Sequence, residues 1–209
     1  VVKRVGQEEF VGSTRWVQVA TPVGAFWVSD WFLADAVTSA DFAEDARVEA
    51  LLDEFAAIVA NDGDLRPVAS RRGLYVSHHS DPVRFASEDL ATILIDSTAY
   101  HWPSNAVAAD DIDEIPARTF AAAIADSFVS AYDDADTVLT VNEPILGGNG
   151  RRPEDAIPFE LEPFNYIGVH DRGDNPEFDG LDWVTWYVSI DYEDGAPVIV
   201  GLTVDMWAP

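Results

Sequence analysis

The four histidines have the most distinctive chemistry in this chain, because an imidazole can bind a metal or transfer a proton. His78 and His79 follow one short apolar run, His170 ends another, and His101 lies in a stretch without periodicity. If both apolar runs are strands of one sheet, these side chains could meet at one end of it. The candidate metal ligands are His78, His101, His170 and Asp171. Such a centre would lower the pKa of a bound water and support a metal-dependent hydrolase.

The spacing of these residues argues against a catalytic centre. No HExxH motif is present, and His78 and His79 would point to opposite faces of a continuing strand. The string Ser77-His-His-Ser-Asp81 has the composition of a hydrolase triad, but neighbours in sequence cannot adopt triad geometry. The GxSxG motif is also absent. We therefore treat a metal-dependent hydrolase as the alternative hypothesis. The sequence favours a protein that is not an enzyme.

An acidic loop between residues 171 and 182 is a candidate calcium site. Its possible ligands are Asp171, Asp174, Asn175, Asp179 and Asp182. Calcium takes six to eight oxygens from flexible loops, but this spacing does not match an EF-hand. The glycine-rich segment 147–152 could hold an anion, although it lacks the P-loop pattern. A solvated turn and a mobile loop are the simpler interpretations, so we predict no cofactor, with Ca²⁺ or Zn²⁺ as alternatives.

Several chemistries are excluded by the residues that the chain lacks. There is no cysteine, so disulfides, thiol nucleophiles and thiolate metal sites are ruled out. The single lysine, Lys3, makes Schiff-base chemistry and P-loop nucleotide hydrolysis implausible. No GxGxxG motif links a strand to a helix, so a Rossmann cofactor site is equally unsupported.

The net charge of −26, from 38 acidic and 12 basic side chains, indicates which partners the protein can bind. A chain this acidic has too few cationic side chains to replace the counterions of DNA, RNA or anionic lipid. We therefore exclude nucleic acids and membranes as partners. The acidity has two explanations. One is solvation in a high-GC or salt-adapted host, as the halophile-like composition suggests. The other is a surface matched to a basic protein or cationic partner.

The long aperiodic segment from residue 96 to 115 is a candidate contact region, because such loops are usually functional or mobile. Its acidic run supplies the candidate partner-binding residues Asp110, Asp111, Asp113 and Glu114. Three further acids, at 133, 134 and 136, oppose the dipole of a predicted helix and hint at a nearby cation. We predict a non-catalytic acidic binding protein, such as an immunity-type inhibitor, a secretion accessory or a virion component.

Length and hydropathy favour one α+β domain spanning residues 1–209. No apolar run is long enough for a membrane span, and the start does not resemble a secretion signal. We therefore expect a cytoplasmic protein or a mature fragment.

Two alternating stretches at about 183–192 and 196–207 predict a C-terminal β-hairpin. A two-residue Asp-Gly loop would place the apolar sets of the two strands on opposite faces. A three-residue loop ending at Gly195 shifts the pairing and sets Trp186 opposite Leu202 on a shared face. We expect that register, with Tyr187 lying over Gly201.

The remaining periodicity predicts helices near 41–60, 87–95 and 116–135, the first capped by Thr38. Residues 1–13 read as a polar lead-in. Further strands are expected at 15–21, 25–31, 73–77, 137–142, 159–162 and 164–170. Together these elements predict an α+β fold, an antiparallel sheet covered on one face by the three helices.

Overall fold

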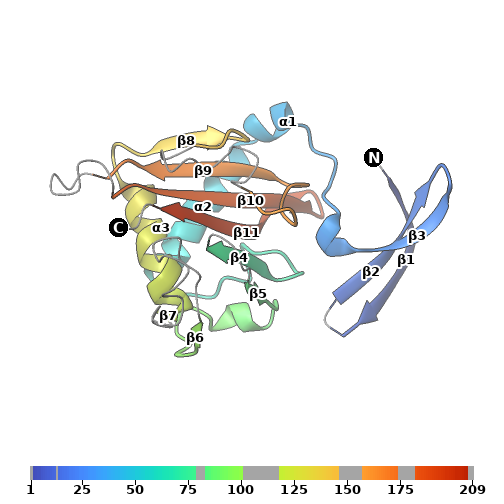
Figure 1. Ribbon diagram of the computed structural model, residues 1–209, viewed down its shortest axis with the longest axis horizontal. Helices are drawn as coiled ribbons and strands as arrows, with labels where there is room; N and C mark the ends of the chain where they lie inside the picture. Colours follow the sequence, from blue (N-terminus) through green and yellow to red (C-terminus); the bar gives the residue numbers. More distant parts are fainter. Residues whose placement is uncertain are drawn as a thin grey trace, which may run out of the picture.

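The computed structural model describes residues 2–12, 14–78, 83–100, 118–145, 157–173 and 182–206. It is an α+β fold in which a small N-terminal sheet stands beside a body built on a six-stranded sheet (Figure 1). No helix in these ranges is both long and apolar enough to cross a bilayer. The predicted fold class is therefore confirmed.

The N-terminal sheet is antiparallel and has the strand order β1-β2-β3. Its strands are β1 (Lys3–Val11), β2 (Thr14–Thr21) and β3 (Gly24–Ser29). Strands β2 and β3 were predicted at 15–21 and 25–31, but the reading of residues 1–13 as a polar lead-in was wrong. Every residue of β1 is exposed, so the strand has no alternation of buried and exposed positions to reveal it. A 3-10 turn at Asp30–Phe32 then leads into the body.

The central sheet has the strand order β5-β4-β11-β10-β9-β8. Its strands are β4 (Leu74–His78), β5 (Val83–Phe85), β8 (Val138–Val141), β9 (Asn165–Asp171), β10 (Val184–Glu193) and β11 (Ala196–Met206). All neighbours are antiparallel except β4 and β11, so the sheet is mixed. Residues 159–162 form a turn rather than the expected edge strand, since the N–H groups of Leu161 and Glu162 both bond to the carbonyl of Pro158. A separate ribbon pairs β6 (Ala99–Tyr100) with β7 (Arg118–Thr119).

The predicted register of the C-terminal hairpin is wrong. Asp194 and Gly195 form a two-residue loop with φ of 53° and 80°, so that Glu193 pairs with Ala196. The register then shifts just beyond the Ile190–Ile199 pair, with Val200 as the extra residue of a β-bulge. Trp186 consequently faces Val204 and Val188 faces Leu202. The bulge still brings the apolar sets of both strands to one face of the sheet.

The expected contact between Tyr187 and Gly201 is also absent. Tyr187 pairs with Thr203, and Gly201 pairs with Ser189. The side chain of Leu161 covers Gly201 instead, with a methyl carbon 2.6 Å from where a Cβ would lie. The glycine is therefore needed because the turn at residues 158–164 packs directly on the sheet.

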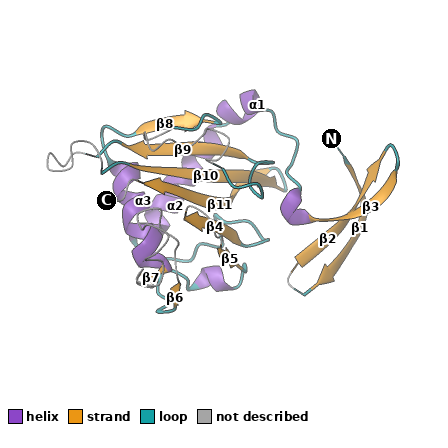
Figure 2. Cartoon of the chain, in the orientation of Figure 1, coloured by secondary structure: helices purple, strands orange, loops and turns teal. Residues whose placement is uncertain are grey.

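The longer helices lie against the face of the sheet that Trp186 occupies, and the short first helix lies near its β8 edge (Figure 2). They are α1 (Ser39–Ala43), α2 (Ala46–Ala60) and α3 (Asp126–Asp133), the last preceded by a π-helical turn at Ala121–Ala125. The predicted 41–60 helix is broken because Asp45 accepts a hydrogen bond from the N–H of Arg47 and starts a new helix. The predicted 87–95 helix is only a 3-10 turn at Asp89–Ala91. Phe55, Phe128 and Trp186 form the centre of the core.

Candidate interaction site

All four partner-binding residues and some of the metal ligands predicted from the sequence fall outside the described ranges. Asp110, Asp111, Asp113, Glu114 and His101 lie there, as do Asp174, Asn175 and Asp179 of the calcium loop. The predictions for these residues therefore stay predictions. The structure places the backbone of His78 and the whole of His170, Asp171 and Asp182.

The strands that end in His78 and His170 do run to the same end of the sheet, because β4, β9 and β11 share one direction. Two strands separate them, however, so the two backbones lie three inter-strand spacings apart, or about 14 Å. His78 is in the row of Val204 and Trp186, whereas His170 pairs with Thr185 in the next row. In the described part of the chain, no three His, Asp or Glu side chains are grouped to hold a metal.

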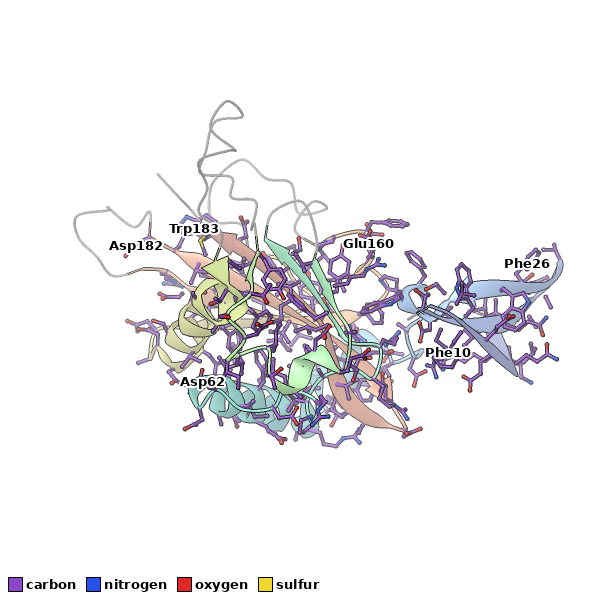
Figure 3. The ribbon with its side chains drawn as sticks, turned by 90° about the horizontal axis from the view of Figure 1, so that it is seen from below. Phe10, Phe26, Asp62, Glu160, Asp182 and Trp183 are labelled. Atoms are coloured by element: carbon purple, nitrogen blue, oxygen red, sulfur yellow. The ribbon has the colours of Figure 1, made fainter. Side chains whose placement is uncertain are left out.

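His170 is a buried, hydrogen-bonded side chain. Its Nδ1 lies 2.8 Å from Oγ1 of Thr185, and its ring tilts against Trp183 at 6.3 Å between centroids. Burial and the charge of the nearby Arg172 lower the pKa of His170. Asp171 accepts a hydrogen bond of 2.8 Å from the N–H of Gly173, which closes a local turn. Trp183 lies at the end of the body away from the N-terminal sheet (Figure 3).

A groove of about 320 Å³ opens beside the edge strand β8, at the upper edge of the sheet in Figure 1. We call it the β8 groove. Its floor is apolar and consists of Phe42, Val48, Leu52, Leu139, Val141 and Ile167. Leu139 and Val141 pair with Val169 and Ile167 of β9, so they continue the helix-covered face of the sheet. Leu139 is nevertheless 52% exposed and Val141 38%.

The outer edge of β8 is the second feature of this site. The N–H of Asn142 bonds to the carbonyl of Tyr166 on β9 at 3.0 Å. Because strand residues alternate in direction, Val141 and Leu139 point their N–H and C=O groups away from β9. In the described residues no further strand pairs with that edge. The strand is short but carries neither the lysine nor the proline that commonly blocks such edges.

The rim of the β8 groove is acidic. Glu44, Asp45 and Glu49 line it from the α1–α2 side. At the start of β8 the exposed acids Asp133, Asp134 and Asp136 continue the negative charge. The effect reaches Tyr132 in the groove wall. Burial, a 2.7 Å hydrogen bond to Asp53, and the charges of Asp53, Glu49 and Asp133 all raise the pKa of that phenol.

The N-terminal sheet is a second exposed apolar surface. Phe10, Val11, Phe26 and Trp27 are each between 42% and 66% exposed on it, which is unusual for side chains of this size. Figure 3 shows Phe26 at the end of this sheet farthest from the body and Phe10 closer to it. Three strands without a covering layer have little core of their own, so this sheet needs further contacts.

A cleft between the N-terminal sheet and the body gathers several of the chain's few basic side chains. It measures about 470 Å³ and is lined by Arg71, Arg72, Arg84, Phe10 and Trp31, among others. Arg71 forms a salt bridge to Glu193, and Arg72 forms one to Asp191. Arg84 stacks over the rings of Trp31 and Tyr75. Arg71 therefore pairs within the body, whereas Arg72 and Arg84 contact residues 30–33, which connect the two sheets.

Neither a protein-family model nor a curated protein nor a solved structure matches this chain. We therefore infer its function from the geometry of its own surfaces. Sequence reasoning missed the β8 groove, although one signal pointed to it. Asp133 sits unfavourably at the carboxyl end of α3, with Asp134 and Asp136 just beyond it, and the charge of Asp133 acts on Tyr132 in the groove wall.

Proposed function

We propose that the protein is a non-catalytic binding protein that accepts an extended segment of a basic protein partner in the β8 groove. One observation carries this proposal: a strand edge that no other described strand pairs with, an apolar floor and an acidic rim occur together at one place on the surface. Each feature alone is common. Together they match the three parts of a basic, apolar strand, namely its backbone, its apolar side chains and its charges.

The binding mode follows from the direction of β8. A partner strand would exchange hydrogen bonds with the outward N–H and C=O groups of Leu139 and Val141. Alternate side chains of that strand would then point to the floor, toward Leu52 and Ile167. Its lysine or arginine side chains would reach Glu44 and Glu49 on the rim. Backbone bonds would supply affinity, and the pattern of apolar and basic residues would supply selectivity.

The charge of the whole chain supports the same partner. A net charge of −26 attracts cationic proteins over long range and speeds their association. Salt should slow this step, because the Debye length falls to about 8 Å at physiological ionic strength. Immunity-type inhibitors, secretion accessories and virion components are classes whose partners fit this description. A metal-dependent hydrolase using His78, His101, His170 and Asp171 is the alternative.

A short synthetic peptide in which lysine alternates with valine tests the proposal. Its binding would be measured by fluorescence anisotropy, with a glutamate–valine peptide as the charge-reversed control. Replacing the rim acids (Glu44→Lys with Glu49→Lys) should weaken binding at least about tenfold, because two attractive charge pairs become repulsive.

A matched variant, Glu54→Lys with Glu162→Lys, makes the same change in net charge on exposed positions outside the groove. It should keep the affinity within about twofold, because the long-range field contributes mainly to the association rate. Equal losses in both variants would mean that the peptide binds the acidic surface at large, and the proposal would be wrong.

A further inference from the structure

The free edge of β1 is self-complementary in sequence. We infer that two copies of this chain pair through β1, antiparallel, around a twofold axis at Gly6, and so join their N-terminal sheets into one six-stranded sheet. This inference uses the N-terminal sheet alone and does not depend on what the β8 groove binds.

β1 has the exposure that such pairing needs. It lies at the edge of its sheet, bonded to β2 on one side only, and all nine of its residues are exposed. Its outer N–H and C=O groups are therefore open to another strand. An exposed edge of this length commonly recruits a further strand. A second copy brings a strand of matching length and the same twist.

The charges of β1 match those of a second β1 running the other way. Pairing around Gly6 sets Lys3 opposite Glu9 of the second copy and Arg4 opposite Glu8 of the second copy. The twofold axis repeats both contacts, so four opposite-charge pairs form. Directly opposed charges of opposite sign stabilise neighbouring strands, and charges of the same sign destabilise them. Lys3 is the only lysine of the chain, and it falls at a position that this register requires.

The faces of the strand agree with this register. Arg4 pairs with Val19 and Glu8 with Val17, so both lie on the same face of the N-terminal sheet. Lys3 pairs with Ala20 and Glu9 with Trp16, which puts them together on the other face. A twofold axis normal to the sheet keeps each face continuous across the two copies. Each charged pair therefore meets on one side of the joined sheet.

The ends of the paired segment are apolar. In the same register Val2 lies opposite Phe10 of the second copy, and these side chains are 44% and 66% exposed in the single chain. Pairing would bury both of them.

Gly6 is suited to the axis. Its φ is +83°, a conformation that favours glycine, and a Cβ at this position would meet no atom within 4 Å. The register of β1 against β2 shifts between Arg4 and Glu8, which places a bulge there. Bulges usually turn an edge away from partners. Here the bulge lies on the axis, where two glycines face each other, and the charged pairs form on either side of it.

Reciprocal charge reversal tests this pairing. Variant A carries Lys3→Glu with Arg4→Glu, and variant B carries Glu8→Lys with Glu9→Lys. In each variant alone, every charged pair across the axis becomes repulsive. In a mixture of A with B, all four pairs are attractive again. The masses of the species in solution would be measured by sedimentation equilibrium of the full chain, with circular dichroism to confirm that each variant is folded.

We expect the unaltered chain to form a dimer, each variant alone to dissociate about a hundredfold more readily, and the mixture to form a heterodimer. The variant Glu54→Lys with Glu162→Lys matches the charge change of variant B and should dimerise normally. A chain that is monomeric at every concentration would overturn the inference. So would variants that dimerise as well as the unaltered chain, or a mixture that stays monomeric.

Discussion

The buried ion pair between Arg72 and Asp191 should be among the most sensitive points of the fold. Their side chains are 5% and 4% exposed, and they form a short salt bridge beneath the segment that enters the body from the N-terminal sheet. Arg72 also donates to the carbonyls of Asp30 and Leu33, at 2.7 and 2.9 Å. Asp191 accepts in turn from the N–H of Asp35, at 2.8 Å. The pair therefore ties residues 30–35 to strand β10.

The cost of breaking this pair can be estimated from its burial. Removing one partner of a buried ion pair costs about 3–5 kcal/mol, because the remaining charge stays in the interior without compensation. Asp191→Asn keeps the shape and leaves Arg72 its carbonyl partners, so we expect a loss of about 3 kcal/mol. Arg72→Met removes the cation that compensates the buried carboxylate of Asp191 and also removes two hydrogen bonds to the carbonyls of Asp30 and Leu33, so its cost should approach about 5 kcal/mol. The double variant should lose less than the sum of the two.

Urea unfolding and thermal melting, both followed by circular dichroism, would measure these losses. For a chain of this size, about 3 kcal/mol corresponds to a fall in Tm of roughly 6–12 °C. Asp194→Asn is the matched control, because Asp194 makes a salt bridge to Arg71 at 3.0 Å but is 86% exposed. Its loss should be close to zero. If Asp191→Asn costs no more than Asp194→Asn, the stabilising role assigned to the buried pair is wrong.

Two further predictions concern a glycine and a carboxylate. Gly73→Ala should cost at least about 2 kcal/mol in urea unfolding, because φ is +98° and the new Cβ would lie 2.0 Å from the carbonyl oxygen of Phe85. Gly195→Ala, with φ of +80° but open space around it, should cost clearly less, and equal losses would refute the clash. Glu193 is buried, which by itself raises its pKa, but hydrogen bonds from Ser70 and Arg71 lower the pKa overall. The ionised carboxylate of Glu193 therefore stabilises the fold fully at pH values above about 4.3, its pKa in the unfolded chain. This stabilisation is lost as the pH falls through the lower pKa that Glu193 has in the folded protein. Glu193→Gln should make unfolding less dependent on pH in that acidic range, and an unchanged pH profile would contradict the prediction.

The sequence predicts those helices and strands that have one buried face and one solvent-exposed face. Helix α2 is such a case, since Val48, Leu52 and Phe55 recur at helical spacing and all are buried. Strand β1 could not be found this way, because both of its faces are exposed. The bulge at Val200 could not be predicted from the sequence either, because the residues around it are uniformly apolar. Residues 198–200 are all apolar, so no polar position marks where the register shifts.

The β8 groove depends on contacts between segments far apart in the chain. Phe42, Leu52, Leu139 and Ile167 come from four elements, and only the folded sheet brings them together. Their sequence neighbourhoods show an apolar strand and an amphipathic helix, which most often form a closed core. The groove is open because β8 is an edge strand of the sheet. The local periodicity of a sequence does not predict the order of the strands in a sheet.

Hydrogen exchange at the outer edge of β8 is the most direct test of the proposed function. In the free protein the amides of Leu139 and Val141 should exchange quickly, while that of Thr140, which faces β9, should be protected. Adding the lysine–valine peptide should slow exchange at Leu139 and Val141 and leave the exposed amides of the N-terminal sheet unchanged. If the peptide binds and these two amides still exchange at their free rate, no strand has been added at β8, and the proposed mode of binding is wrong.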